Sequence, residues 1–386
     1  MNNNQNSLNR KIWKELKDIF EKLKGSRGEE EINQCILRGV MNLCKILELP
    51  PRFSNVFGKF QKHEGILYTL PYYRDHFIHM FHVFCLGYFI LNKWWINEVP
   101  FFGSEDNDRK NEVLKTWFIA SIQHDIAYPV ERAEIWVPRF PKDALDLDIE
   151  ILSYFDWSPI LVTGESALHI EKMTENFLYP LNTTSNEDEI YRKKIAFKNW
   201  FNKQLLEKHD HGALGSLSIL NFGWRESELE CVYNAALIVL LHNYSINRDV
   251  TIGELTFKSY PLAFLLTYCD TVQEWGRTQT EPLNGLHRLF DTSTKFERLD
   301  VTRQYTTVTL SYNIEERCRK RVKSWSRLDK SEQKKERDQE EDAIRTSIHK
   351  DVQLVCLAWQ LGNLTHRFDI KTQDENEKEF CSIRII

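Results

Sequence analysis

The sequence has no closely spaced cysteine pair and no long apolar segment. Its eight cysteines are scattered, none forms a CxxC pair, and no signal-peptide pattern precedes them. Such spacing is typical of reduced thiols in a cytosolic protein. The longest apolar run, residues 77–91, contains two histidines and is too short to cross a bilayer. We therefore expect a cytoplasmic protein without a membrane segment.

A charge excess of one sign is also absent. The formal net charge is −5 and the isoelectric point is about 6.2, so the composition does not indicate a nucleic acid or a membrane as partner. Apolar residues make up 42% of the 386 residues, which is enough for a large core in a chain longer than one typical domain. We predict an N-terminal helical segment at 1–60, a larger helical domain at 61–290 and a C-terminal appendage at 291–386.

Helical periodicity dominates the first 290 residues, where strand-like alternation is scarce. Two amphipathic helices come first, around 12–23 and at 29–48, and the LPP sequence at 49–51 ends the second. Seven further helices are expected at 74–95, 111–127, 165–178, 189–208, 211–221, 226–243 and 260–277.

The pattern changes after residue 292. Segments 301–312, 366–373 and 379–386 alternate with β-branched and aromatic residues, which predicts strands. A strongly charged helix is expected between them, at 326–345. The predicted fold is therefore mainly α, with a small C-terminal α+β appendage.

The stretch FIASIQHDIAYPVE places His124 and Asp125 at the end of an apolar helix, just before Pro129. A histidine–aspartate pair is weak evidence by itself, since the chain contains a second one at 209–210. The simplest structural explanation is a helix cap, in which the imidazole binds carbonyl groups of the last turn.

Other polar residues interrupt apolar helices at positions that a plain core would fill with leucine. They are His76, His79, His211, His242 and Asp270. Burying an unpaired carboxylate is costly. Arg277 could pair with Asp270, but no arginine or lysine lies within a turn of Asp125 on its N-terminal side. A divalent cation bound by imidazole and carboxylate groups would satisfy both acids.

The order His79, His124–Asp125, Asp270 resembles the HD-domain superfamily of metal-dependent phosphohydrolases over roughly residues 70–277. That superfamily has an all-helical fold. Val83 follows His79 by four residues, as in the HxxxV helix of the family. Two further histidines, in HGALGS (His211) and LLHNYS (His242), match those of members that hold two metals.

The resemblance implies a site with one or two divalent metal ions, whose number and identity (Mn, Fe, Zn, Co or Mg) stay open. The first ion would be held by His79, His124, Asp125 and Asp270, and the second by His211 and His242 with Asp125 as the bridge. Such a centre activates water for attack on a phosphoester. The implied substrate is a small anionic phosphoester, most simply a nucleotide or a nucleotide second messenger.

Neighbouring residues are candidates for catalysis and substrate binding. His76, or Asp75 beside it, is the candidate proton donor to the leaving group, and Asp125 the central catalytic carboxylate. The expected substrate-binding residues are Arg74, Tyr128, Glu131, Arg132, Glu274 and Arg277. A surface ion pair is the alternative role for Glu274.

The resemblance is incomplete. HDIAYPVE lacks the glycine and lysine of the family's HDIGK, and the GYP tripeptide of cyclic-dinucleotide phosphodiesterases is absent, so that substrate is not carried over. Two other function classes stay open. One is a di-iron oxygenase built on the same residues, and the other is a non-catalytic nucleotide-sensing module that signals through its C-terminal part. A homo-oligomer formed through an exposed strand edge is also compatible with the sequence.

Overall fold

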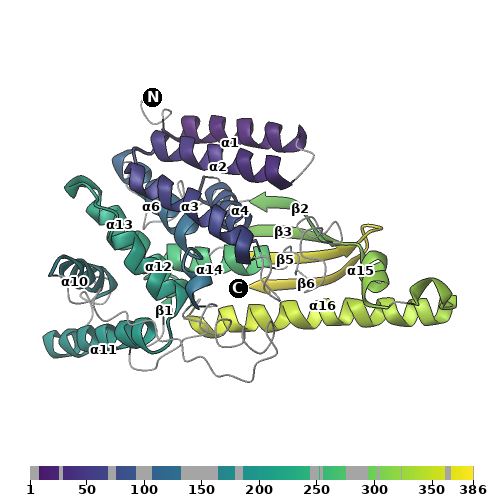
Figure 1. Ribbon diagram of the computed structural model, residues 1–386. Coiled ribbons are helices and arrows are strands. Elements are labelled where there is room, and N and C mark those ends of the chain that lie inside the picture. Colours follow the sequence, from purple (N-terminus) through teal and green to yellow (C-terminus); the bar gives the residue numbers. More distant parts are fainter. Residues whose placement is uncertain are drawn as a thin grey trace, which may run out of the picture.

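The computed structural model describes residues 8–25, 29–67, 75–92, 107–131, 164–178, 186–243, 252, 255–274, 294–301, 305–322, 324–360 and 367–385. A helical body is joined to a small sheet and a long helix at the C-terminal end (Figure 1). The predicted fold class, mainly α with a small α+β appendage, is confirmed.

All seven helices expected between residues 74 and 277 are present, with ends shifted by a few residues. Their bounds are α4 (His76–Ile90), α6 (Asn107–Gln123), α10 (Gly164–Leu178), α11 (Glu187–Leu206), α12 (His211–Leu220), α13 (Leu229–His242) and α14 (Pro261–Glu274). The short 3₁₀ turn Glu226–Glu228 precedes α13.

Three helices precede α4, where the sequence predicted two. They are α1 (Leu8–Gly25), α2 (Glu29–Ile46) and α3 (Pro51–Leu67). The prediction was wrong because Pro51 begins a helix. A proline in the first helical turn lacks only an N–H that would have no partner there, and its φ suits the helix. In α3, Phe53 and Phe57 are fully buried and Phe60 is nearly so, which anchors this helix to the core.

The centre of the body is formed by α4 and α6 with α12, α13 and α14. Of the residues of α4, only His82 is exposed, because apolar side chains surround this helix on all sides. The indole of Trp117 on α6 lies where a side chain on Gly87 of α4 would be, and its Nε1 donates to the Phe84 carbonyl at 3.0 Å. This contact sets the spacing between the two helices.

The C-terminal sheet has the order β2 (Thr294–Val301), β3 (Tyr305–Tyr312), β5 (Arg367–Asp374), β6 (Glu379–Ile385). Its two central strands are parallel and are connected through α15 (Ile314–Arg321) and α16 (Lys330–Ala358). The charged helix predicted at 326–345 corresponds to the first half of α16. Its second half carries the buried residues Ile344, Ile348, Val352 and Val355.

The sheet is attached to the helical body through α14. The short strand β1 (Leu255–Thr256) pairs in parallel with β4 (Trp359–Gln360) at the end of α16. On α14, the rings of Phe264 and Tyr268 lie 5.4 and 4.5 Å from that of Phe368 on β5. One continuous apolar core thus crosses the predicted domain boundary at residue 290.

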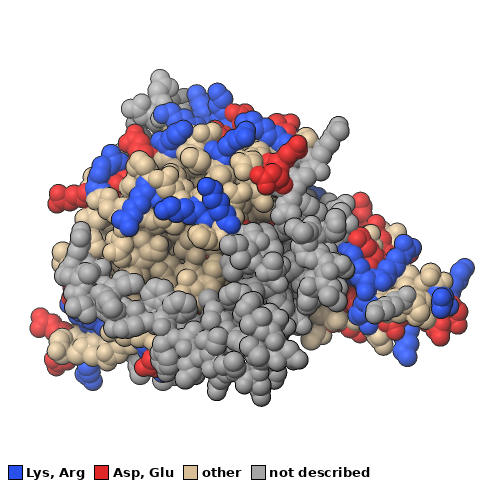
Figure 2. All heavy atoms as spheres, in the orientation of Figure 1, with Lys and Arg blue, Asp and Glu red and all other residues tan. Residues whose placement is uncertain are grey.

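The described surface carries charges of both signs. On the face shown in Figure 2, Lys and Arg side chains gather over the N-terminal helices, with acidic residues among them. Within the described ranges, no helix is both long enough and apolar enough to traverse a membrane.

Glu228 is a buried carboxylate that joins α6 to the start of α13. It is 2% exposed, and its Oε1 accepts hydrogen bonds from Lys115 Nζ at 2.7 Å and from Arg225 Nη2 at 2.9 Å. Burial alone would raise the pKa of Glu228, but the two cations outweigh it and lower this pKa to about 2. The carboxylate is therefore more acidic in the folded protein than in the unfolded chain.

A glutamine at position 228 is expected to destabilise the protein in a pH-dependent way. The ion pairs stabilise the fold fully above a pH of about 4.5, and this contribution is lost as the pH falls toward 2. We expect Glu228→Gln to lower the free energy of unfolding by about 2 kcal/mol at pH 7 and by less at pH 3. Urea unfolding at both pH values measures this, with the exposed Glu230→Gln as control. An equal loss at both pH values would contradict the prediction.

Candidate metal centre

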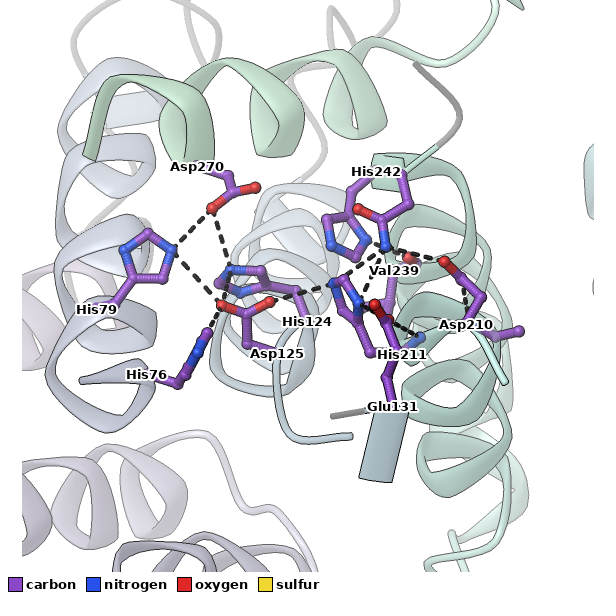
Figure 3. Close-up of polar contacts among 12 residues, drawn as sticks. His76, His79, His124, Asp125, Glu131, Asp210, His211, Val239, His242 and Asp270 are labelled. Atoms are coloured by element: carbon purple, nitrogen blue, oxygen red, sulfur yellow. Dashed lines mark hydrogen bonds and ion pairs between the residues drawn. The ribbon is translucent and has the colours of Figure 1, made fainter. Parts of the chain in front are cut away.

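Six residues expected to bind metal converge from four helices and from the turn that follows α6 (Figure 3). One potential ligand atom from each of His79, His124, Asp125 and Asp270 lies within 4.8 Å of the others, and the same holds for Asp125, His211 and His242. Asp125 belongs to both groups. The doublet follows α6, while the other four residues lie on α4, α12, α13 and α14.

The first group surrounds a common point. His79 Nε2 lies 2.7 Å from Asp270 Oδ1 and 3.7 Å from Asp125 Oδ2. His124 Nε2 lies 3.5 Å from Asp125 Oδ2 and 3.6 Å from Asp270 Oδ1. Two atoms that bind one ion at about 2.1 Å lie roughly 3.0–3.5 Å apart. The four residues therefore converge closely enough to share one cation.

Two of the histidines are oriented by their own helices. Nδ1 of His124 donates to the Ser121 carbonyl at 2.8 Å, and Nδ1 of His242 donates to the Val239 carbonyl. In each neutral ring the proton is then on Nδ1, and Nε2 offers a lone pair. Both Nε2 atoms are buried and make no hydrogen bond within the described part of the chain. A bound cation would satisfy them, and the cap role considered for His124 leaves its Nε2 available.

Asp125 links the two groups because its two oxygens face different histidines. Oδ2 faces His79 and His124, whereas Oδ1 lies 3.4 Å from His211 Nε2. The ring of His242 lies 5.2 Å from that of His211 and 5.4 Å from that of His124. The carboxylate is 5% exposed, so this bridge lies in the interior.

The electrostatics keep both carboxylates ionised. Burial alone would raise the pKa of Asp125, but His124, His76 and His211 hold this pKa well below its usual range. The pKa of Asp270 is lowered in the same way by His124 and His79. The centre therefore offers two anionic carboxylates, which suit divalent cations.

The histidines respond differently to their surroundings. Burial alone would lower the pKa of His124, but the charges of Asp125 and Asp270 outweigh it and raise this pKa. Burial, together with His211 and His124, lowers the pKa of His242 to about 4. His242 is thus neutral near pH 7, the form in which imidazole binds metal.

Two glycines allow α12 to approach the centre closely. A Cβ at Gly212 would lie 2.9 Å from the Val239 carbonyl oxygen and 3.3 Å from His242 Cε1, and one at Gly215 would lie 3.2 Å from the Gln123 carbonyl oxygen. Larger residues would push α12 away from α13 and α6 and carry His211 with it. Packing therefore requires Gly212, and a Cβ at position 215 would force its neighbours to shift by a few tenths of an ångström.

Asp210 and Asn243 lie beside His211 and were not among the residues expected at the site. Asp210 is the N-cap of α12: its Oδ1 accepts from Ala213 N at 2.9 Å, and its Oδ2 accepts from Asn243 Nδ2 at 3.1 Å. An aspartate directly before a helix is a common N-cap, so the second doublet at 209–210 contained this signal. The contact with Asn243 depends on the fold and has no local signal.

The chain matches no protein family model, no curated protein and no solved structure. The resemblance to the HD-domain superfamily therefore rests on the order of the site residues in the sequence.

His76 and Tyr128, expected to act in catalysis and substrate binding, lie beside the centre. Nδ1 of His76 donates to Asp125 Oδ2 at 2.8 Å. The ring of Tyr128 lies 4.1 Å from that of His76 and 5.3 Å from that of His211. Tyr128 thus contacts residues on both sides of Asp125.

The other residues expected at the site lie in different surroundings. Asp75 precedes α4 and is half-buried, while His82, three residues after His79, is exposed. Glu131 contacts His211 directly, with 2.6 Å between Oε2 and Nδ1. Four expected substrate-binding side chains lie outside the part that the structure describes: Arg74, Arg132, Glu274 and Arg277.

Proposed function

We propose that this protein is a metal-dependent phosphohydrolase of the HD type that cleaves a phosphoester, with a nucleotide or a nucleotide second messenger as its substrate. The observation that carries the proposal is the Asp125 carboxylate shared between two buried histidine groups. Two divalent cations held there would polarise phosphoryl oxygens and lower the pKa of a water molecule. With four positive charges against two carboxylates, the centre would attract an anionic substrate.

Residues of this chain would position a proton donor and supply the proton for the leaving oxygen. Because Nδ1 of His76 donates to Asp125, Nε2 is the atom from which a proton would pass to the leaving oxygen. The ring of Tyr128 packs against His76 and limits its rotation. The neighbouring Asp75 is the other candidate donor.

The test is a metal analysis of the purified full-length protein combined with a phosphate-release screen over nucleotides. We expect about two divalent ions per chain, release of phosphate from at least one nucleotide, and loss of both after chelation with recovery on adding metal. Turnover that needs iron and oxygen would indicate the di-iron oxygenase instead. Nucleotide binding without turnover under any metal would indicate a sensing module. Either result would overturn the proposal.

Substitution of His76 separates its two roles. Asparagine can still donate to Asp125 from its amide but cannot protonate a leaving group, whereas alanine loses both functions. We expect His76→Asn to keep the metal content and to lower kcat by roughly 10²–10⁴-fold, the usual contribution of general acid catalysis. A kcat profile over pH, beside metal analysis, is the measurement. Full activity in His76→Asn would exclude this residue as the acid.

A further inference from the structure

Glu131 is held against the first turn of α12. Its Oε2 accepts a hydrogen bond from His211 Nδ1 at 2.6 Å and another from the His211 backbone N–H at 3.1 Å (Figure 3). One carboxylate oxygen thus binds two donors of the same residue. Glu131 lies six residues after Asp125, so this contact ties the chain that follows the doublet to α12.

His211 needs such an external partner because of its place in its helix. His124 and His242 lie at the ends of helices, and their Nδ1 atoms donate to carbonyl groups three residues earlier. His211 is the first residue of α12, so no preceding turn offers a carbonyl. Glu131 supplies the acceptor from another part of the chain.

A third cation site is the competing explanation, because Glu131, Asp210 and His211 also offer ligand atoms within 4.8 Å of one another. Their atoms are already engaged, however. Glu131 Oε2 accepts from the His211 backbone N–H as well as from His211 Nδ1, and Asp210 Oδ1 accepts from Ala213 N, so both carboxylates cap the first turn of α12. The two carboxylates also complement the positive end of the α12 dipole. This group therefore holds the start of α12.

From these contacts we infer that Glu131 is a positioning residue that sets the affinity of the second metal position. It keeps the proton of His211 on Nδ1, so the lone pair is on Nε2, which lies 3.4 Å from Asp125 Oδ1 and accepts a hydrogen bond from Asn243 Nδ2 at 3.0 Å. A carboxylate partner also makes the imidazole a stronger ligand than a carbonyl partner would. The inference rests on the proposed function only in requiring that the centre binds metal.

The experiment is a Mn²⁺ titration of the chelated full-length protein by isothermal calorimetry, for the wild type, Glu131→Ala and Glu131→Gln. In Glu131→Ala we expect one Mn²⁺ site to weaken by about 10–100-fold and the other to stay unchanged. Glu131→Gln should lose less, because its amide oxygen can still accept the Nδ1 proton. Glu230→Gln, an exposed carboxylate on α13, is the control and should bind like the wild type.

The possible results distinguish the role of Glu131 from the existence of the metal centre. If the wild type binds two Mn²⁺ ions and Glu131→Ala binds both with unchanged affinity, the role of Glu131 is refuted while the metal centre stands. Equal weakening of both sites would also refute it, because the effect would then be a general distortion. If the wild type binds no Mn²⁺, the metal centre itself is refuted, and the role of Glu131 with it. Unequal weakening, with partial rescue by glutamine, supports the inference.

Discussion

Asp125→Asn is expected to remove both metal ions and to lower phosphate release by roughly 10³-fold or more, a loss of about 4 kcal/mol of transition-state stabilisation. Asparagine has nearly the same shape, so the buried position stays filled. It lacks the negative charge that faces His79 and His124 through one oxygen and His211 through the other. A neutral amide cannot replace a bridging carboxylate between two cations.

Two further variants show whether Asp125→Asn loses both ions because Asp125 serves both metal positions. Asp270 belongs only to the first group and His242 only to the second. Asp270→Asn should therefore weaken one metal position and His242→Asn the other, whereas Asp125→Asn weakens both. Metal content per chain and phosphate release would be measured for all three. Glu228→Gln, which neutralises a buried carboxylate away from the centre, is the matched control. Two tightly bound ions and normal turnover in Asp125→Asn would contradict the whole assignment.

The residues of the centre could be predicted because ionisable side chains are unusual on helices that are otherwise apolar. Helices such as α4 and α13 are apolar around their whole circumference, so each histidine on them needs a reason. His82 shows the limit of spacing arguments: it lies three residues beyond His79, yet it points to solvent. Burial, which only the fold reveals, selects His79.

The supporting contacts could not be predicted, because they join segments that are distant in sequence. Glu131 was expected to meet substrate, since the chain shows only that it follows the doublet. Its contact with His211 spans 80 residues, and that of Asn243 with Asp210 spans 33. Local signals also failed for β2, whose sequence TKFERLDV mixes charged residues with few apolar ones. Pairing with β3 stabilises that strand.

Gly87→Ala is expected to lower the free energy of unfolding by about 3 kcal/mol, near the upper end of overpacking effects. An added Cβ would lie 1.9 Å from Cζ2 and 2.4 Å from Cε2 of Trp117, a rigid and fully buried indole. Gly58→Ala is the matched control, since a Cβ there comes no closer than 3.7 Å to Leu37. It should be neutral or stabilising by up to about 1 kcal/mol, because alanine is the better helix former. Urea unfolding measures both.

A double-mutant cycle tests whether the clash with Trp117 is the cause. Phenylalanine at position 117 removes the atoms nearest to Gly87, so Gly87→Ala should cost about 1–2 kcal/mol less in a Trp117→Phe background. Additive effects would contradict this mechanism. The same contact spaces α4, which carries His79, from α6, which precedes His124. Gly87→Ala should therefore weaken the first metal position at temperatures where the variant is still folded, while Gly58→Ala should leave it unchanged.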